Sequence, residues 1–579
     1  MSLDSLWLVG RSIVDMTPDV KGIGMLGYGN PKNYVAGVET PISCRVLWIQ
    51  NPRSKKQVVF VNLEICFPTQ SLRTEIEKNL EKSWGLNEED LIITTQHTHS
   101  APGGYTHYAL YSMSTPGFCQ EVLDTYSRSV IEGLKQAFES LSKGEVFYKK
   151  GSFAPEIPVA FNRSMKAYNR NIEIHAPLKV EEQNLAINRE MSMLELRVDK
   201  APWASINWFA VHCTSIMWRN QLISPDNKGY AALYLEDYLK KEGIENYVSA
   251  FAQGDAGDVS PLYQVPYWKR FFPNKVDDEF KNARANGRLQ FEKAKEILGQ
   301  EGIELKGDIE NEIFYRDLGN IIVDPEYLPE YLREKEIKTS PATLGIAFLK
   351  GAENAGIDWP LELFATAIAR IIQIFEVLVT ALMNSKRAIK VRRKYKAQRP
   401  KNIFVESGEK RLLGTDYVMG LILPSIVDPT VKYFKRMHKE GGLKEHSWTP
   451  QILPFQISII GNIAFIMLPF ETSTMSGRRI KKSSLNILKE RGIKEIQLVP
   501  YANQYAGYIT TPEEYSAQCY EGGHTVFGKW TLPAVQTVLK ELLNHMLEEE
   551  EDRFLDKTLR PPEFSEEELR IRKFSPHNY

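Results

Sequence analysis

The 579-residue sequence lacks an excess of either charge. It contains 72 Lys and Arg residues against 73 Asp and Glu residues, so its formal net charge is −1. A protein without an overall electrostatic field does not attract nucleic acid or an anionic surface through bulk charge. We therefore expect no nucleic-acid partner, and any attraction to an acidic surface has to come from a local basic segment.

The sequence also has few cysteines and no targeting signal. The five cysteines form no CxxC or other paired spacing, which favours a reducing compartment. The first residues, MSLDSLWLVG, contain no basic region, sustained apolar region or small-residue cleavage site. A membrane-spanning helix typically needs 18 or more consecutive apolar residues, and the sequence contains no uninterrupted apolar run of that length. The sequence thus predicts a cytoplasmic protein without a signal peptide or a transmembrane helix.

The composition supports a large folded core, since 43% of the residues are hydrophobic and 11% aromatic. Runs rich in β-branched residues alternate with amphipathic helical patterns, which predicts an α/β fold: a large mixed sheet with covering helices. The Gly461-Asn462 pair indicates a hairpin turn, and the strands 193–198 and 206–211 are expected to form a second hairpin. The expected strands are 57–65, 91–95, 193–198, 206–211, 247–252, 457–460, 463–468 and 496–499, and the expected helices are 71–84, 120–141, 230–241, 477–491 and 532–549.

The segment 361–384 is almost wholly apolar and is followed by a basic run, KRAIKVRRKYKAQRPK, over 386–401. Its polar exceptions recur every three or four residues, which places them on one narrow stripe of a helix. They are Glu362, Thr366, Arg370, Gln373, Glu376, Thr380 and Asn384. Two interpretations stay open: peripheral contact with an anionic membrane through 361–401, or a helix buried in the protein with a solvated basic connector.

Polar side chains with metal-binding capacity follow several of the expected strands. In α/β sheets, ligands bind at the carboxyl ends of the strands, so these side chains are predicted to share one site there. Two histidines and a carboxylate with one open position are the composition of a catalytic zinc site, which supports amide or ester hydrolysis. The residues are His97 and His99 after LIITT, His212 after INWFAV, Ser260 after YVSAFA, Glu471 after FIMLP, and Tyr508 beyond IQLVP.

Two other motifs do not indicate sites. Gly22-Ile-Gly24-Met-Leu-Gly27 spells GxGxxG, but it follows loop-forming residues and no helical pattern comes after it, so a dinucleotide site is not expected. Ser260 lacks the GxSxG context of a nucleophile elbow.

Several segments together resemble the neutral/alkaline (non-lysosomal) ceramidase family, in that family's order and approximate spacing. The similarity runs from Val9 to about Lys540, with 340–448 the weakly matching part. It implies a catalytic domain with a zinc ion at the base of a deep apolar pocket, and hydrolysis of the amide of N-acylsphingosine (ceramide) to sphingosine and a fatty acid. The segments are QHTHSAPGGY, FNRSMKAY, WFAVHCTSI, LISPDNKGYAALY, FAQGDAGDVSP, LPFETSTMSGRR and YANQYAGYITTPEEYSAQCYEGGHTVFG.

The resemblance also implies roles for individual residues. One Zn²⁺ ion would be held by His97, His212, Glu471 and Tyr508. The catalytic residues around the scissile amide would be His99, Arg163, Ser260 and Tyr520. A metal-activated water would attack the amide carbon while His99, Tyr520 or Arg163 donates to the oxyanion, and a nearby histidine would pass a proton to the leaving amine. Ser260 is either a nucleophile or a residue that positions substrate hydroxyls; positioning is favoured because no base lies near it in the sequence.

The chain departs from the family pattern in a few places. Leu262 and Ala101 stand where Asn and Gly are common in the family. We expect this protein to lack the family's secretion signal and C-terminal β-sandwich domain. We expect a ceramidase-like catalytic domain over 1–545, a divergent insert over 340–448 that carries the apolar helix and the basic run, and a charged tail over 546–579.

Three hypotheses for function follow. The first is zinc-dependent hydrolysis of ceramide. The second is the same chemistry on another N-acyl lipid or amide, and the third is a lipid-binding protein without catalytic turnover, because a family alone does not fix a substrate.

Overall fold

The structure is a computed structural model that describes residues 7–30, 32–80, 84–112, 115–261, 276–352, 359–383, 385–414, 429–549 and 553–574. Leu262 and Asn384, both singled out in the sequence, lie outside the described residues.

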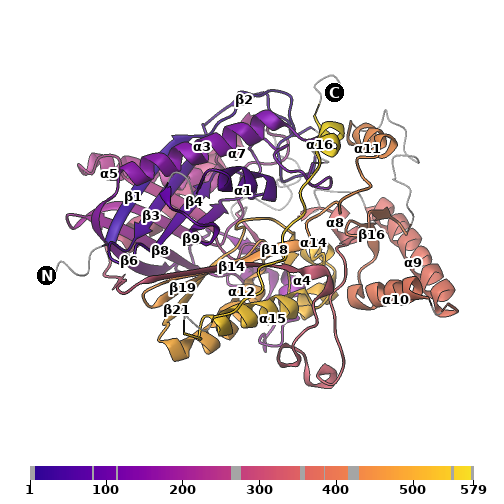
Figure 1. Ribbon diagram of the computed structural model, residues 1–579. Coiled ribbons are helices and arrows are strands. Elements are labelled where there is room, and N and C mark those ends of the chain that lie inside the picture. Colours follow the sequence, from indigo (N-terminus) through magenta and orange to yellow (C-terminus); the bar gives the residue numbers. More distant parts are fainter. Residues whose placement is uncertain are drawn as a thin grey trace.

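Two β-sheets packed face to face form the centre of the fold (Figure 1). The larger sheet has the order β11-β9-β8-β6-β1-β3-β4-β5, and the short β13 (Ile303–Glu304) also pairs with β6. Its strands are β1 (Trp7–Asp15), β3 (Ser43–Gln50), β4 (Gln57–Leu63), β5 (Leu91–Thr95), β6 (Ser142–Ser152), β8 (Glu190–Val198), β9 (Ala201–Phe209) and β11 (Val248–Gln253). The smaller sheet has the order β14-β18-β19-β21, formed by β14 (Ile309–Asp317), β18 (Ile452–Ile460), β19 (Ile463–Met467) and β21 (Glu495–Val499).

Aromatic side chains fill the space between the two sheets. Phe60 of β4 packs edge-on against Trp208 of β9 and Phe465 of β19, with ring centroids 6.0 Å and 5.4 Å away. Because all three rings are buried, this contact holds the sheets together through the hydrophobic effect.

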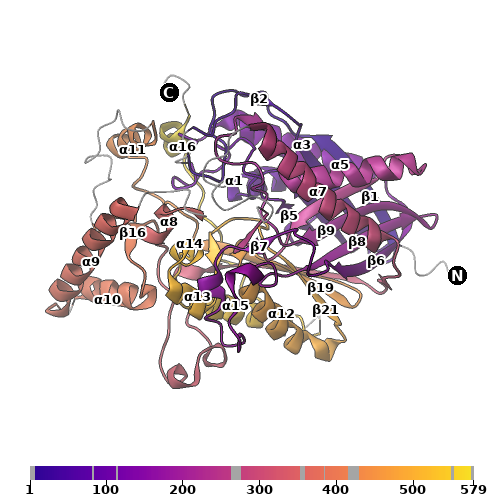
Figure 2. The same cartoon turned by 180° about the vertical axis from the view of Figure 1, so that it is seen from behind.

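Helices cover the outer face of each sheet, so the fold has four layers, α/β/β/α (Figures 1 and 2). The larger sheet is covered by α1 (Gln70–Glu77), α3 (Gln120–Glu139), α5 (Asp226–Lys241) and α7 (Val276–Leu298). The smaller sheet is covered by α12 (Thr474–Leu488) and α15 (Thr531–His545). The expected α/β class with a mixed sheet and covering helices is confirmed. The division into two stacked sheets was not predicted.

Both expected hairpins are present. The strands β8 and β9 are antiparallel and joined by Asp199 and Lys200, both left-handed with φ of 51° and 67°, as a two-residue type I′ turn requires. Between β18 and β19, Gly461 has a φ of 60°, which glycine adopts without steric cost.

Short strand pairs carry the chain from the main sheets into the site. β20 (Glu471–Thr472) pairs in parallel with β22 (Tyr508–Ile509), and β7 (Phe161–Asn162) pairs with β12 (Val259–Ser260). Smaller elements surround them: β2 (Gly37–Val38), β10 (Leu222–Ile223), α4 (Met165–Tyr168), α13 (Pro512–Ala517) and α14 (Tyr520–His524).

A helical hairpin, α9 (Trp359–Ala381) and α10 (Lys386–Gln398), projects from one end of the molecule, at the right in Figure 1. It rests on a small sheet and one turn of helix: β15 (Leu344–Gly345), β16 (Ile403–Glu406), β17 (Arg411–Leu412) and α8 (Ile346–Leu349). The expected helix over 361–384 is therefore present as α9. Its interpretation as a buried helix is wrong, because Leu363, Phe364 and Phe375 are 60–66% exposed.

The part of α9 from Glu362 to Ala381 is long and apolar enough to cross a membrane, judged by length and composition alone. The sequence had predicted no spanning helix, because polar residues interrupt the apolar run.

The described part of the C-terminal tail packs against the rest of the fold. α16 (Glu566–Arg572) lies beside α11 (Pro429–Glu440), and its Arg572 is buried. The Arg572 guanidinium donates to the carbonyls of Gly442 and His107 and pairs with Glu568.

Candidate active site

Two histidines predicted as metal ligands follow the strands β5 and β9 of the larger sheet, and their rings are fixed by backbone carbonyls. His97 follows β5 with a left-handed φ of 74°, and its Nδ1 lies 2.6 Å from the carbonyl of Cys66. His212 follows β9, and its Nδ1 lies 3.0 Å from the carbonyl of Val259. A carbonyl accepts only, so we assign the proton of each ring to Nδ1, which leaves the Nε2 lone pair available.

Glu471 of β20 faces both of these Nε2 atoms. Its Oε1 lies 3.6 Å from His97 Nε2, and its Oε2 lies 3.1 Å from His212 Nε2. On the other side the carboxylate accepts hydrogen bonds from Tyr505 and Tyr501, at 2.5 Å and 3.0 Å. Burial alone would raise the pKa of Glu471, but His97 and His212 hold that pKa well below its ordinary value. The carboxylate is therefore charged.

These donors fit a small cation such as Zn²⁺. Burial lowers the pKa of His97 to about 4, so its ring is neutral near pH 7 and no proton lies between Nε2 and the carboxylate. Facing lone pairs repel each other unless a cation lies between them. With Zn–N distances near 2.0–2.1 Å, the ligand atoms of a tetrahedral site lie about 3.3 Å apart. The separations of 3.6 Å and 3.1 Å bracket that value.

A second group, Cys66 with His97 and His99, also has donor atoms within 4.8 Å of one another. It is the weaker candidate, because His97 Nδ1 already bonds to the Cys66 carbonyl. Burial also raises the pKa of the Cys66 thiol well above its ordinary value, which keeps the thiol protonated and a poor ligand.

Tyr508, the fourth predicted ligand, is the register partner of Glu471 in the parallel β20–β22 pair. Side chains of register partners project from the same face of a sheet, which places the Tyr508 phenol beside the carboxylate. Its hydroxyl accepts a hydrogen bond from Arg163 at 3.2 Å. Burial and the nearby Glu471 raise the pKa of Tyr508 well above its ordinary value, so the phenol is neutral here.

His99 lies beside the cluster, with its Nε2 3.1 Å from His97 Nε2. Its Nδ1 is buried and has no hydrogen-bond partner among the described residues. The ring of Tyr28 packs against it edge-on at 4.6 Å, and Gly27 lies directly against its other side. The glycine pattern 22–27 thus includes the residue that makes room for this imidazole.

Arg163 connects the remaining predicted residues. Its guanidinium donates to Glu521 at 2.9 Å, to the carbonyl of Gly257 at 2.8 Å and to Tyr508. It also lies 5.6 Å from the centre of the Tyr520 ring. Ser260 is buried in β12, which pairs with β7 immediately before Arg163.

The structure therefore brings the predicted site residues into one region. Three predicted ligands, His97, His212 and Glu471, have donor atoms within 4.8 Å of one another. The other five lie around them through the contacts just described. Their chemical roles stay predictions.

Several residues around the site were missed in the sequence. They are the carboxylate partners Tyr501 and Tyr505, the Arg163 partner Glu521, the spacer Gly27, and His524. His524 is buried with neither ring nitrogen hydrogen-bonded to a described residue, and its ring lies 5.3 Å from that of Tyr508. The sequence did contain a signal for Tyr501 and Tyr505: the segment YANQYAGY, which follows strand β21, contains both of them together with the predicted ligand Tyr508.

A four-layer α/β fold with two imidazoles and a carboxylate converging at strand ends defines an α/β enzyme with a candidate metal centre. Residues 7–419 and 432–537 match the family model of the neutral/alkaline non-lysosomal ceramidases, N-terminal region, so the chain belongs to the neutral/alkaline ceramidase family of amidohydrolases.

Relatives from distant organisms agree with this assignment. The chain is 29% identical to the neutral ceramidase of Pseudomonas aeruginosa, over 92% of this chain and 71% of the relative. It is also 29% identical to that of Mycobacterium tuberculosis, over 93% and 77%. The crystal structure of the Pseudomonas aeruginosa enzyme superimposes with a TM-score of 0.75 at 26% identity, covering 97% of this chain and 77% of the other. A structure described as ceramidase complexed with C2 gives a TM-score of 0.77 at 26% identity, covering 97% and 78%.

Proposed function

We propose that this protein hydrolyses the amide bond of ceramide in a zinc-dependent reaction, releasing sphingosine and a fatty acid. The observation that carries the proposal is the convergence of His97 Nε2, His212 Nε2 and the Glu471 carboxylate in a buried site. Relatives that share most of the chain are named neutral ceramidases. His97, His212, Glu471 and Tyr508 would hold the ion, which supplies Lewis acidity and an activated water.

The other residues have roles that follow from their hydrogen-bonding capacity. Arg163 and Tyr520 lie side by side and are donors for the oxygen of the scissile carbonyl. Burial raises the pKa of Tyr520, which keeps its phenol protonated and able to donate. His99, whose Nδ1 has no hydrogen-bond partner among the described residues, would carry a proton toward the leaving amine. Ser260 lies on β12, which pairs with β7, and would position the substrate hydroxyls.

Contact with a membrane is a separate proposal, which suits this substrate because ceramide is an apolar lipid that resides in bilayers. We propose that the protein is cytoplasmic and binds a membrane peripherally through 361–401. The exposed apolar side chains of α9 support this location.

The test is to measure zinc per purified chain and the release of fatty acid from labelled ceramide. We expect about one zinc ion per chain and clear release. His97→Ala and His212→Ala should lose both, whereas His175→Ala, which changes an exposed histidine outside the site, should keep both. A folded protein that holds zinc but leaves ceramide intact would overturn the proposal.

The same assays separate the other hypotheses. A hydrolase of a different N-acyl lipid would turn over N-acyl amino acids or N-acylethanolamines faster than ceramide. A lipid-binding protein without turnover would bind liposomes and function equally well after His97→Ala.

A further inference from the structure

The polar stripe of α9 faces the protein, which is the reverse of an ordinary surface helix. Glu376 pairs with Arg411 at 2.7 Å and accepts a hydrogen bond from Tyr395 of α10. Gln373 donates to the carbonyl of Lys401 at 3.3 Å, and Arg370 donates to Asn402 at 3.1 Å. Toward the start of the helix, Glu362 pairs with Lys350 at 3.5 Å. The polar side chains thus attach α9 to the body along most of its length.

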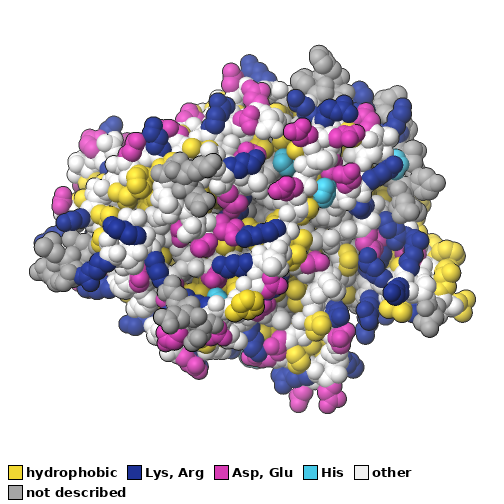
Figure 3. All heavy atoms as spheres, viewed as in Figure 1, with side chains coloured by type: hydrophobic (Ala, Val, Ile, Leu, Met, Phe, Trp, Pro, Cys, Tyr) yellow, Lys and Arg dark blue, Asp and Glu magenta, His cyan; other side chains and the backbone are white. Residues whose placement is uncertain are grey.

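The apolar side chains of α9 face outward instead. Large side chains that are 60–67% exposed recur along one face, and the face continues into the turn after the helix, where Leu382 is 93% exposed. Monomeric soluble proteins rarely expose a continuous apolar face of this length, and such faces mark interaction sites. In Figure 3 hydrophobic side chains gather at the right edge, over α9. The residues are Leu363, Phe364, Ile371, Ile374, Phe375 and Leu378.

Basic side chains border this apolar face. Helix α10 begins directly after the turn, and Figure 3 shows Lys and Arg side chains clustered beside the hydrophobic ones. Lys394 is buried and neutralised by Glu406 and Glu409. The ion pairs among the described residues leave four exposed cations of α10 without an acidic partner: Lys386, Arg387, Arg393 and Lys396.

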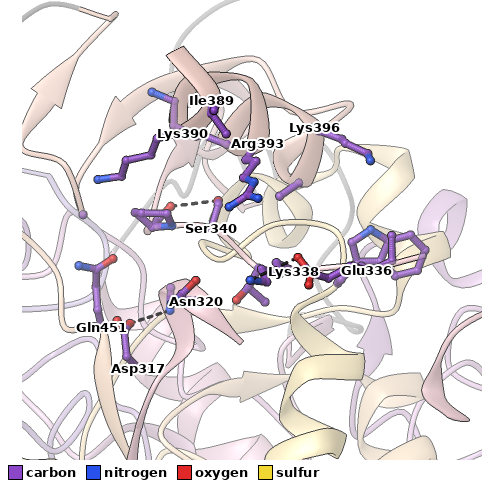
Figure 4. A pocket seen from close by; sticks show the side chains of 18 of the residues that line it. Asp317, Asn320, Glu336, Lys338, Ser340, Ile389, Lys390, Arg393, Lys396 and Gln451 are labelled. Atoms are coloured by element: carbon purple, nitrogen blue, oxygen red, sulfur yellow. Dashed lines mark hydrogen bonds and ion pairs between the residues drawn. The ribbon is translucent and has the colours of Figure 1, made fainter. Parts of the chain in front are cut away.

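Three of these cations, Lys386, Arg393 and Lys396, line a cavity of about 910 Å³ between α10 and the segment 317–341. Figure 4 shows Arg393 pointing from α10 into this cavity, toward the strand segment that carries Lys338. Two acidic residues also line the cavity, but Glu336 is paired with Lys338 at 3.3 Å and Asp317 accepts from the backbone of Gly319. The cavity therefore has an excess of positive charge.

We propose that α9 and α10 form a surface that docks on an anionic lipid bilayer. The apolar face of α9 lies flat at the boundary between headgroups and acyl chains, and the cations of α10 pair with acidic headgroups. The body contacts of Glu362, Arg370 and Glu376 prevent α9 from crossing the bilayer, because crossing would remove these charges from their partners.

The charge of the surface favours a bilayer over a second copy of the chain. Two copies meeting through this face would bring the same cations together, while the acidic residues that the structure describes on α9, Glu362 and Glu376, are already paired with Lys350 and Arg411. Anionic headgroups supply the missing countercharge, and an apolar face together with a basic patch provides the two signals that stable membrane anchoring needs.

This surface is connected to the candidate active site through one layer of structure. Lys401, whose carbonyl accepts from Gln373 of α9, donates through Nζ to the carbonyl of Thr525 at 2.8 Å, directly after α14. Phe348 of α8 stacks on Tyr520 of α14, with centroids 5.4 Å apart. Docking would therefore place the site close to a membrane-resident substrate. This consequence rests on the proposed function, whereas docking itself does not.

The experiment is cosedimentation of the full-length, metal-loaded protein with vesicles that contain no ceramide. We compare phosphatidylcholine alone with phosphatidylcholine containing roughly 30% phosphatidylserine. We expect about tenfold stronger binding to the acidic vesicles, weakened by ~0.5 M salt and reversed by alkaline carbonate. Resistance to carbonate would overturn the peripheral geometry in favour of a spanning helix.

Exposed-face variants test the surface itself. Phe375→Glu and Leu378→Glu, and separately Arg393→Glu with Lys396→Glu, should each reduce binding at least about tenfold. Ile303→Glu and Lys241→Glu, which change exposed residues of the larger sheet and its covering helix α5, are the matched controls and should bind like wild type. Thermal melts check that each variant is folded.

Two results would overturn the docking surface. One is unchanged binding in folded α9 and α10 variants. The other is a wild-type dimer that these variants dissociate, which would make a second copy the occupant. Turnover of a short-chain, water-soluble N-acyl substrate is measured in parallel. Docking without turnover would refute the proposed function alone, and turnover without docking would refute the docking surface alone.

Discussion

Gly27 lies directly against the imidazole of His99: a Cβ built on Gly27 would stand 2.3 Å from His99 Cγ. No real Cβ contact is that short, so any other residue at position 27 has to displace the imidazole. The position of His99 beside His97 therefore requires that residue 27 has no side chain.

We predict that Gly27→Ala lowers kcat by about 100-fold, because a displacement of about 1 Å costs this much when a reacting group must be aligned. Zinc content should stay near wild type, since His97, His212 and Glu471 do not contact Gly27. Gly29→Ala is the control: Gly29 also has a positive φ, 65°, but no atom lies within 4 Å of the added Cβ. Equal activity losses in both variants would point to backbone strain instead of the displacement of His99.

Tyr501 and Tyr505 each donate to one oxygen of Glu471. Removing either hydroxyl by Tyr→Phe should weaken zinc affinity about 10- to 100-fold, as the loss of a hydrogen bond to a metal ligand typically does. Chelator competition on the purified protein measures the affinity. Tyr126→Phe, which removes a buried hydroxyl bonded to the carbonyl of Pro102 outside the site, should leave it unchanged. If Tyr501→Phe and Tyr505→Phe retain wild-type affinity, Glu471 does not bind the ion in the geometry seen here.

Glu521 acts as a positioning residue for Arg163. It accepts from Arg163 at 2.9 Å and from the Ser164 hydroxyl at 2.6 Å, and both residues are buried. Glu521→Gln leaves the Arg163 charge without its ion-pair partner, which should cost about 3 kcal/mol of folding stability. We expect kcat to fall more than KM changes, with zinc retained.

The matched control is Glu513→Gln, which removes an ion pair with Arg479 at the surface of α13. It should leave kcat near wild type. A loss of zinc in Glu521→Gln would show that the residue supports the metal centre and not only Arg163.

His107 makes the stability of the fold depend on pH. Burial, together with the charges of Arg572 and Lys78, lowers the pKa of His107 to about 4. The unfolded chain, with a histidine pKa of about 6.5, binds this proton between pH 6.5 and 4 while the folded chain does not. The stability contribution is therefore complete above pH 6.5 and decreases as the pH falls through this window, by about 2 to 3 kcal/mol.

Urea unfolding of wild type and His107→Gln between pH 4 and 7.5 measures this effect. The difference in unfolding free energy between the two proteins should change across the window by that amount. His175→Gln, which changes an exposed histidine, should follow the wild-type profile. A pH-independent difference between wild type and His107→Gln would contradict the assignment.

Several residues of the candidate site could be predicted from the sequence because they follow strands, and the ends of strands meet at one edge of a sheet. His97, His99, His212 and Glu471 all come directly after apolar runs that are strands in the structure. Glu521 and Tyr505 were not found, because their importance lies in contacts with residues far along the chain. Glu521 reaches Arg163 across 358 residues, a pairing that no local pattern contains.

The sequence of α9 determined that a helix forms there with one narrow polar stripe, because the spacing of residues fixes the faces of a helix. The sequence did not determine which face of α9 contacts the rest of the protein. The partners that bind the stripe are Arg411 of β17 and the residues Lys401 and Asn402 immediately before β16, and they assemble beside the helix only in the folded chain.

The sequence by itself determined the α/β class, both hairpins, the helix at α9 and the residues able to bind a metal, because periodicity and residue chemistry are local properties. Only the tertiary structure decided the stacking of two sheets, the direction of the apolar face of α9 and the carboxylate's position between two imidazoles. The stacked sheets and the carboxylate depend on side chains hundreds of residues apart, and the face of α9 depends on partners 28 to 35 residues away. All of them become neighbours only when the core buries its apolar surface.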